Sequence, residues 1–289
     1  MLLPAVIFLF IFGIVPIAGN IIAFQRYNPM AAFWGLASQF VGMLNFRSVF
    51  LMNASSRQVI INTLILAVSK IVMELIVPVA FALLLNEIVN RFLKRFIQTV
   101  VYLPYFLSWV IAGAMFRQIF ATNGLINTGL IGAGILQDPY LFMASNVWFR
   151  PIIILTDTWK NFGYNAIIYI AAITSIDLNL FEAADIDGAS RWQKMRYVTI
   201  PGIMPTIVML STLALGGVLN AGFDQVFVMY NPMVYATGDI LDTFVYRIGL
   251  VNMQFQMATA VALSKSVISM LLIILSYWMA KKFAGYRIF

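Results

Sequence analysis

Six long apolar stretches divide the chain and limit what it can fold into. A hydrocarbon layer about 30 Å thick requires about 20 helical residues, so each stretch is long enough to cross a bilayer. Backbone groups in lipid must be hydrogen-bonded within their own segment, and the alternating pattern of a barrel strand is absent, so each stretch is expected to be helical. The sequence therefore predicts an all-α, polytopic membrane protein with six transmembrane helices in a single domain, residues 1–289. The predicted spans are 2–24, 59–85, 97–120, 147–173, 202–222 and 257–279.

Composition excludes most catalytic chemistry. Hydrophobic residues make up 62% of the chain and charged residues 10%, against roughly 45–50% and 25% in soluble domains. The sequence contains neither Cys nor His, which removes thiolate nucleophiles, imidazole bases and the commonest zinc ligands. We therefore expect no enzymatic activity, no catalytic residues, no metal site and no cofactor bound by this chain. The net charge of +7 is interpreted as cationic loops, not as nucleic-acid binding.

The cationic residues indicate an orientation. Three clusters lie in segments that alternate correctly to share one side of the membrane, and short loops rich in Lys and Arg face the cytoplasm. Both termini are then expected to be cytoplasmic. Three arginines at positions 26, 47 and 57 oppose this assignment. The supporting clusters are Arg91, Lys94 and Arg95; Arg191, Lys194 and Arg196; and Lys281, Lys282 and Arg287.

The least hydrophobic run of the chain lies in the loop 175–200, before the fifth span. It reads FEAADIDGASRWQKMRYVTIPGIMP from residue 181. Acidic residues gather at its start and cationic residues at its end, which complements the partial charges at the ends of a helix. On helix physics alone, a solvated helical loop explains this pattern.

A specific resemblance adds to that interpretation. Glu182-Ala183-Ala184, three residues, Gly188, nine residues and then VTIP is similar to the EAA signature of permease subunits in binding-protein-dependent ABC importers, EAA-x3-G-x9-I-x-L-P. Val198 and Ile200 replace Ile and Leu. Similarity to the carbohydrate-type permeases of this family extends over NTLILAVSKIVMELIVPVAFALLLNEI, TVVYLPYFLSWVIAG and YNPMVYATGDILDTFVYRIGL.

The resemblance implies a fold, a mechanism and partners. Residues 182–190 would form a cytoplasmic coupling helix resting on a separate ATP-hydrolysing subunit, with small residues allowing close approach and acidic residues bonding to partner cations. The chain has no G-x-x-x-x-G-K-[ST] run, so ATP and Mg would be used by partner subunits. The implied coupling residues are Glu182, Ala183, Ala184, Asp185 and Gly188.

The same resemblance implies a heterodimer with a second homologous permease, two ATP-binding subunits and an extracytoplasmic solute-binding protein. The location would be the bacterial cytoplasmic (inner) membrane. The branch it resembles imports oligosaccharides or polysaccharide fragments, and an acidic saccharide such as an alginate fragment is one alternative.

Ionisable residues within apolar stretches are costly and mark functional candidates. Lys70 and Glu74 lie four residues apart on one helical face, and a structural ion pair is the favoured interpretation. Asp157 and Lys160 lie three apart and could also pair. Pro78, Pro104 and Pro205 are expected to kink or interrupt their helices.

Aromatic and polar residues share two helical turns around Lys160. Flat rings stack on the C–H faces of sugars, and amides bond to their hydroxyls, so the mixture suits a saccharide pathway. Packing between helices explains it equally well. The pathway candidates are Trp159, Lys160, Asn161, Tyr164 and Asn165, with Lys265, Asn220 and Asp224 added from the fifth and sixth spans; Lys265 has no carboxylate at helical spacing.

Two other classes of protein remain to be weighed. An ion-coupled secondary transporter would need coupling carboxylates and usually inverted repeats, and only Asp157 and Glu74 offer the first. A membrane enzyme would need a convergent acid–base or metal site, which is hard to build without His and Cys.

Overall fold

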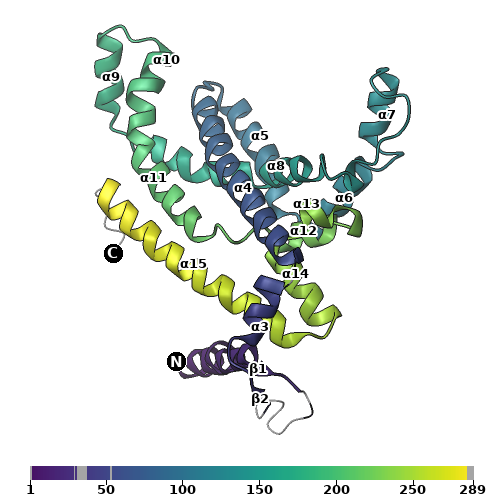
Figure 1. Cartoon of the computed structure of the whole chain (residues 1–289). Coiled ribbons are helices and arrows are strands. Elements are labelled where there is room, and N and C mark those ends of the chain that lie inside the picture. Colours follow the sequence, from purple (N-terminus) through teal and green to yellow (C-terminus); the bar gives the residue numbers. More distant parts are fainter. Residues whose placement is uncertain (1, 29, 31–37, 53, 285–289) are drawn as a thin grey trace.

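The computed structural model describes residues 2–28, 30, 38–52 and 54–284 (Figure 1). Helices dominate these residues. Their one sheet consists of two short antiparallel strands, β1 Gln25–Arg26 and β2 Gln39–Phe40. The predicted all-α class is confirmed. Arg287, one of the cations used to predict orientation, lies outside the described residues.

Within the described residues, four helical stretches are each long and apolar enough to cross a membrane, and two bent pairs raise the number to six. Each predicted span overlaps one of them. The single stretches are Leu3–Phe24, Ser55–Asn86, Arg191–Gly216 and Phe255–Trp278, and the bent pairs are Arg91–Phe106 with Trp109–Ile119 and Phe149–Thr174 with Leu178–Ile186.

The first stretch changes helical form along its length, and its C-terminal 3₁₀ segment packs against the last helix of the chain. None of its most apolar window is buried against the chain. A short helix then leads toward the second span. The elements are α1 Leu3–Leu9, a π-helical turn Phe10–Ile14, α2 Val15–Ala18, a 3₁₀ segment Gly19–Phe24, α3 Leu44–Arg47 and a π-helical turn Ser48–Met52.

Two long helices, α4 (Ala54–Asn86) and α8 (Phe149–Thr174), pack side by side and form the centre of the molecule (Figure 1). Phe149, Ile153 and Tyr169 of α8 are almost completely buried. At about 25 cal/mol per Å² of apolar surface, burying one such side chain stabilises the fold by about 1.5–3 kcal/mol. This pair is the frame on which the polar sites described below are built.

The third predicted span is not one straight helix. α5 (Arg91–Tyr102) continues into a 3₁₀ segment, Leu103–Phe106, and α6 (Trp109–Ile119) leaves at 101°. Pro104 lies in the 3₁₀ segment, and the Ser108 hydroxyl accepts from the Ile111 amide to cap α6. The expected interruption at Pro104 is confirmed, whereas α4 and α11 continue through Pro78 and Pro205.

The segment between the third and fourth spans projects from the body as α7 (Leu125–Gly132), at the upper right of Figure 1. A 3₁₀ turn, Phe142–Ala144, then leads into α8.

A helix–turn–helix follows α8, and we call residues 177–199 the 177–199 loop. Asp177 begins it, with its carboxylate accepting from the Asn179 amide at 3.0 Å. Its elements are α9 Leu178–Ile186, α10 Arg191–Lys194 and a π-helical turn Met195–Thr199, after which α11 Ile200–Gly216 forms most of the fifth span. Figure 1 places α9 and α10 at one extremity of the molecule.

The fifth span ends earlier than predicted. Helix α11 ends at Gly216, whereas the predicted span continues to Gly222, because two consecutive glycines, 216 and 217, disfavour continuation of the helix. The next segment, which we call the 223–251 hairpin, folds back at the opposite extremity before the last helix. Its elements are α12 Phe223–Met229, a 3₁₀ turn Pro232–Val234, α13 Tyr235–Gly238, α14 Leu241–Tyr246 and a π-helical turn Arg247–Val251, followed by α15 Phe255–Ala284.

Candidate functional site

The 177–199 loop is held in shape by its own backbone. At the end of α9 the Ala189 amide donates to the Ala184 carbonyl at 2.9 Å, and the Gly188 amide donates to the Asp185 carbonyl at 3.0 Å. These two bonds form a Schellman motif, which requires a left-handed residue after the helix. Gly188 supplies it, with φ of +73°.

Gly188 has a role within this chain that the sequence did not predict, and the close approach of a partner at this glycine stays a prediction. We predicted a small residue that lets a partner approach closely. A Cβ built at Gly188 meets nothing within 4 Å, so within the chain the glycine is needed for its backbone conformation and not for space. Any other L-residue there incurs the cost of the left-handed region.

The predicted coupling residues lie on an open surface. Glu182, Ala183, Asp185 and Gly188 are exposed and Ala184 is half-buried. Asp185 accepts from Lys194 Nζ at 2.6 Å, so part of its bonding capacity is used inside the loop. Glu182 is the acidic side chain left most available to a partner.

Two apolar residues of the same surface were not singled out from the sequence. Leu178 is 73% exposed and Ile186 is 87% exposed. Together with Glu182, they lie at four-residue spacing on one face of α9. The position of Ile186 in the least hydrophobic run of the chain was the available signal, whereas Leu178 precedes that run.

A buried polar cluster joins the fourth span to the second, and it corrects the predicted ion pairs. Lys70 Nζ lies 3.2 Å from Asp157 Oδ1, and both side chains are less than 10% exposed. The expected pairs, Lys70 with Glu74 and Asp157 with Lys160, are both wrong. Helices α4 and α8 pack closely enough that the carboxylate across the interface is nearer than the one a turn away.

The same cluster reaches the 223–251 hairpin. Lys70 Nζ donates to the Ala221 carbonyl at 2.8 Å and to Gln225 Oε1 at 2.5 Å, while Gln225 Nε2 donates to the Ile153 carbonyl at 2.8 Å. Gly222 has φ of +86°, and a Cβ there would lie 2.7 Å from Lys70 Nζ. Lys70 of α4 therefore links the segment that follows α11 to both α4 and α8.

The pathway candidates on α8 separate onto two sides. Asn161 interacts with Glu74 of α4, and Asn165 lines a cavity of about 150 Å³ with Glu74 and Tyr169. The two asparagines therefore face the second span. Trp159, Lys160 and Tyr164 instead face the bent third span.

On that second side, Lys160 lies among aromatic rings. Its ammonium donates to the Tyr105 carbonyl at 2.8 Å and lies 5.1 Å and 5.4 Å from the ring centres of Tyr105 and Trp109. The Tyr105 and Tyr164 rings stack with centroids 3.8 Å apart. Such distances favour cation–π attraction. We call Tyr105, Trp109, Lys160 and Tyr164 the Lys160 cluster.

Exposed rings border the Lys160 cluster. Tyr164 is 41% exposed and Trp159 is 38% exposed, with the Trp159 ring packed edge-on against Phe116 of α6 at 5.2 Å. From the sequence, Pro104 was expected to interrupt the third span, and Ser108 and Trp109 were considered as residues that could line a cavity, whereas Tyr105 was not singled out. Tyr105 and Trp109 become part of the site because the chain bends between them.

The remaining candidates lie near the 223–251 hairpin. Lys265 Nζ lies 2.6 Å from Asp242 Oδ1, so the carboxylate missing from its own helix is supplied by α14. Asn220 and Asp224 are exposed, on the segment that joins α11 to α12 and in the first turn of α12. Among the described residues, no hydrogen bond or ion pair joins Asn220 or Asp224 to the Lys160 cluster.

The 223–251 hairpin is fastened by residues that sequence reasoning missed. Arg247 donates to the two carboxylate oxygens of Asp239 through its terminal nitrogens Nη1 and Nη2, and its guanidinium carbon lies 4.4 Å from the Tyr235 ring centre. Burial disfavours the Arg247 charge, but the bonds and charge of Asp239 outweigh it and raise the pKa of Arg247. An Asp eight residues before an Arg was the available signal.

A second set of bonds ties this hairpin to the central helices. Arg150 Nη2 donates to Asn62 Oδ1 at 2.7 Å, Arg150 Nε donates to the Thr237 carbonyl at 3.0 Å, and Asn62 Nδ2 donates to the Asp239 carbonyl at 3.0 Å. Residues from α4, α8 and the hairpin therefore share one network.

Comparison with known proteins places these features in a family. The family described as "Binding-protein-dependent transport system inner membrane component" matches residues 74–285. Protein LplB of Bacillus subtilis is 37% identical over 286 residues, which cover 98% of this chain and 88% of LplB. The polygalacturonan/rhamnogalacturonan transport system permease protein YteP of the same organism is 38% identical over 98% of this chain and 87% of YteP.

Two solved structures share the whole fold. A chain from a bacterial ABC transporter involved in the import of the acidic polysaccharide alginate matches with a TM-score of 0.89 at 32% identity, covering 98% of this chain and 94% of that chain. A chain from the alginate ABC transporter in complex with its alginate pentasaccharide-bound periplasmic protein matches with a TM-score of 0.88 at 33% identity, covering 98% and 93%.

Proposed function

Because the chain belongs to the family of binding-protein-dependent transport system inner membrane components, we propose that it carries an acidic oligosaccharide or polysaccharide fragment past the Lys160 cluster. The chain is a multi-pass permease subunit of an ABC importer of sugars. We propose further that the substrate is acidic, that named residues of this chain contact it, and that partner proteins bind at two surfaces.

The proposal of an acidic substrate rests on the positive charge of Lys160. Among the described residues its nearest partners are a carbonyl and two aromatic rings, whereas the nearby Asp157 is paired with Lys70. A cation without its own carboxylate attracts the carboxylate of a uronic acid, and the exposed rings of Tyr164 and Trp159 stack on sugar faces. YteP is named for transport of polygalacturonan and rhamnogalacturonan, and the alginate transporter is described as importing an acidic polysaccharide, which supports the same chemistry.

The exposed surface of α9 is the proposed contact with an ATP-hydrolysing subunit. Glu182 offers charge-assisted bonds, and Leu178 and Ile186 offer apolar anchors on each side of it. ATP and Mg are then used by the partner subunits. The complete importer would consist of a heterodimer of this permease with a second permease, two ATP-binding subunits and an extracytoplasmic solute-binding protein.

Movement between the two ends follows from the bent helices. Closing of the ATP-binding subunits moves α9, and α9 follows α8 after a bend of 68°. Because α8 carries Lys160 and the Asp157 pair, its displacement changes the site. The cationic loops support an orientation in which α9 and both termini are cytoplasmic and the 223–251 hairpin faces the binding protein.

The test is uptake by the complete importer reconstituted in proteoliposomes, with trigalacturonate and galactotriose as acidic and neutral probes. Lys160→Gln is expected to reduce trigalacturonate uptake at least tenfold and to leave galactotriose uptake within twofold. Arg26→Gln, which removes an exposed cation elsewhere, is the matched control. Equal loss with both probes, or none, contradicts the acidic assignment.

Omitting the ATP-binding subunits separates the two classes of transporter. The proposal expects no uptake without them, with or without an ion gradient. Uptake by the permease alone would indicate an ion-coupled secondary transporter.

A further inference from the structure

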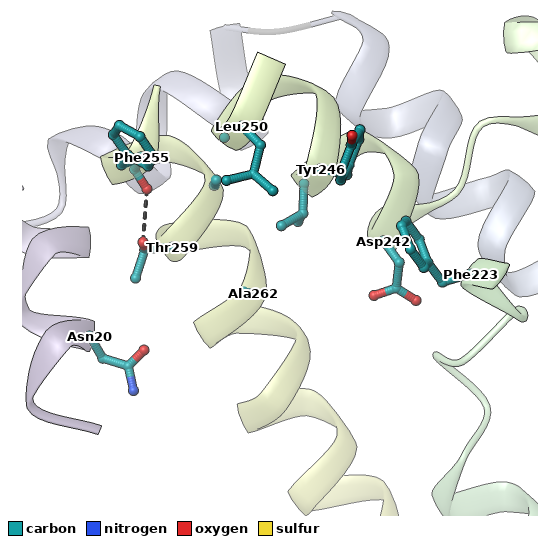
Figure 2. Close-up of a pocket in the computed structure, with 11 residues that line it drawn as sticks. Asn20, Phe223, Asp242, Tyr246, Leu250, Phe255, Thr259 and Ala262 are labelled. Carbon is teal, nitrogen blue, oxygen red and sulfur yellow. Dashed lines mark hydrogen bonds between the residues drawn. The ribbon is translucent and has the colours of Figure 1, made fainter. Parts of the chain in front are cut away.

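A hollow of about 530 Å³ lies where the first span, the 223–251 hairpin and α15 meet (Figure 2). This volume lies within the 300–1,000 Å³ typical of ligand sites. Asn20 borders it from the first span, Phe223 and Asp242 from the hairpin, and Phe255 and Thr259 from α15. We call it the Asp242 hollow. It is separate from the Lys160 cluster, with which it shares no residue.

The sequence leaves this space open by placing small residues where helices meet. Gly249 of the π-helical turn and Ala258 and Ala262 of α15 line the hollow. In Figure 2, Ala262 and Thr259 lie between Asn20 on one side and Asp242 with Phe223 on the other. Larger side chains at these positions would fill the space.

The lining combines ring faces with hydrogen-bonding groups. The rings come from Phe223, Tyr246 and Phe255, and the polar groups are the Asn20 amide, the Asp242 carboxylate and the Thr259 hydroxyl. A sugar residue presents C–H faces and hydroxyls in the same mixture. An acyl chain would offer no hydrogen bond to the Asn20 amide or to the Asp242 oxygen that Lys265 does not contact.

A neighbouring hollow shows what an acyl-chain site in this molecule looks like. It measures about 370 Å³ and is lined by Phe24, Met43, Phe46 and three aliphatic residues of α15, with Ser264 as the one hydroxyl. The contrast between the two linings favours lipid in the second and a polar ligand in the Asp242 hollow.

The charge of the hollow defines the ligand further. Lys265 Nζ bonds to Asp242 Oδ1 at 2.6 Å, so the pair is neutral as a whole. A carboxylate has about four lone-pair sites, and the pair uses few of them. Asp242 can therefore accept hydrogen bonds from sugar hydroxyls. Because the pair is neutral, it neither attracts nor repels a charged sugar, in contrast to Lys160.

We propose that the Asp242 hollow is a binding site for one or more sugar residues of the cargo, read through their hydroxyls and ring faces irrespective of charge. This inference rests on the proposed function. The hollow lies at the end of the spans that carries the 223–251 hairpin, so on the proposed orientation it receives the saccharide from outside before Lys160 does.

Uptake of trigalacturonate and galactotriose by the reconstituted importer tests the proposal. Asp242→Asn, combined with Lys265→Gln so that no unpaired cation remains, is expected to raise the KM for both probes about tenfold, since a hydrogen bond to a charged group is lost, with the maximal rate changed less than threefold. Ala262→Phe, which fills the space without altering charge, is expected to raise both KM values similarly. Leu271→Phe adds the same ring on the exposed surface of α15, away from both hollows, and is expected to have no effect.

Three outcomes would overturn the proposal. One is a wild-type KM in complexes of both the double variant and Ala262→Phe that assemble normally. Another is loss for trigalacturonate alone, which would make the hollow an anion site. The third is a phospholipid that mass spectrometry detects with the wild-type chain and that Ala262→Phe removes. Failure of the proposed function is distinguishable, because it is measured by wild-type uptake and by the Lys160→Gln variant, neither of which alters the hollow.

Discussion

The 223–251 hairpin and the 177–199 loop occupy opposite extremities of the molecule and are built on opposite principles (Figure 1). The hairpin directs its polar side chains inward: Asp239, 2% exposed, binds Arg247, and Arg150 joins the hairpin to α4. The loop directs its side chains outward, and Glu182 and Ile186 are exposed.

The source of order also differs between the two regions. The hairpin is ordered by bonds to other elements, so its conformation depends on α4 and α8. The loop is ordered by its own caps, the Asp177 carboxylate, the Gly188 turn and the reciprocal Ser190–Gln193 capping box. A self-capped helix leaves its surface available for a partner, whereas an internally bonded hairpin supplies a fixed wall for a site.

Removing one partner of the hairpin's ion pair should produce the largest loss of stability. Asp239→Asn leaves Arg247 without its charge partner in a partly buried position, at a cost of about 3–5 kcal/mol. The expected result is a lower midpoint of thermal unfolding for the purified complex in detergent. Asp138→Asn, an exposed change, should leave the midpoint unaltered. Equal midpoints in the two variants would show that the hairpin is not held as described.

The buried cluster of Lys70, Asp157 and Gln225 tests whether the conformation of the hairpin depends on the central helices α4 and α8. Lys70→Met leaves Asp157 buried and unpaired, which should lower the free energy of unfolding by about 3 kcal/mol or more. The double variant Lys70→Met with Asp157→Leu should recover part of that loss, because no buried charge remains. Additive losses would show that the two residues stabilise the fold independently.

Gly188 tests the loop's reliance on its own caps. Gly188→Val should disfavour the left-handed turn by about 1–2 kcal/mol, whereas Gly188→Asn should cost less because asparagine tolerates that region. Hydrogen exchange of the α9 amides should quicken in the valine variant, with the midpoint of global unfolding unchanged. Equal exchange in both variants would contradict a conformational role for the glycine.

The sequence predicted the features that depend on local pattern. Apolar windows gave the helices, and the break at Pro104 followed from the chemistry of proline. The proposed substrate site could be anticipated only in part: Lys160 and Tyr164 share a helical face, but Tyr105 and Trp109 join them through a bend of 101° that no periodicity reveals.

The ion pairs could not be predicted because they depend on packing between helices. Helical spacing offered Glu74 to Lys70, yet the structure pairs Lys70 with Asp157, which is 87 residues away in the sequence. Lys265 had no carboxylate on its own helix and found Asp242 on α14. In both cases the local arrangement was compatible with several partners, and contact between elements decided among them.

Glu182 should show the smallest effect on stability and separates the loop's fold from its surface. The side chain is exposed and outside the caps of α9, so Glu182→Lys should change the free energy of unfolding by less than about 0.5 kcal/mol. Asp187→Lys makes the same charge change at the end of α9, where a cation suits the helix dipole. If Glu182 bonds to the ATP-binding subunit, only Glu182→Lys should abolish uptake and the ATPase stimulation caused by the loaded binding protein. Equal loss in both variants would mean that the charge of the whole loop matters and not the Glu182 position, and normal uptake in Glu182→Lys would remove the proposed contact.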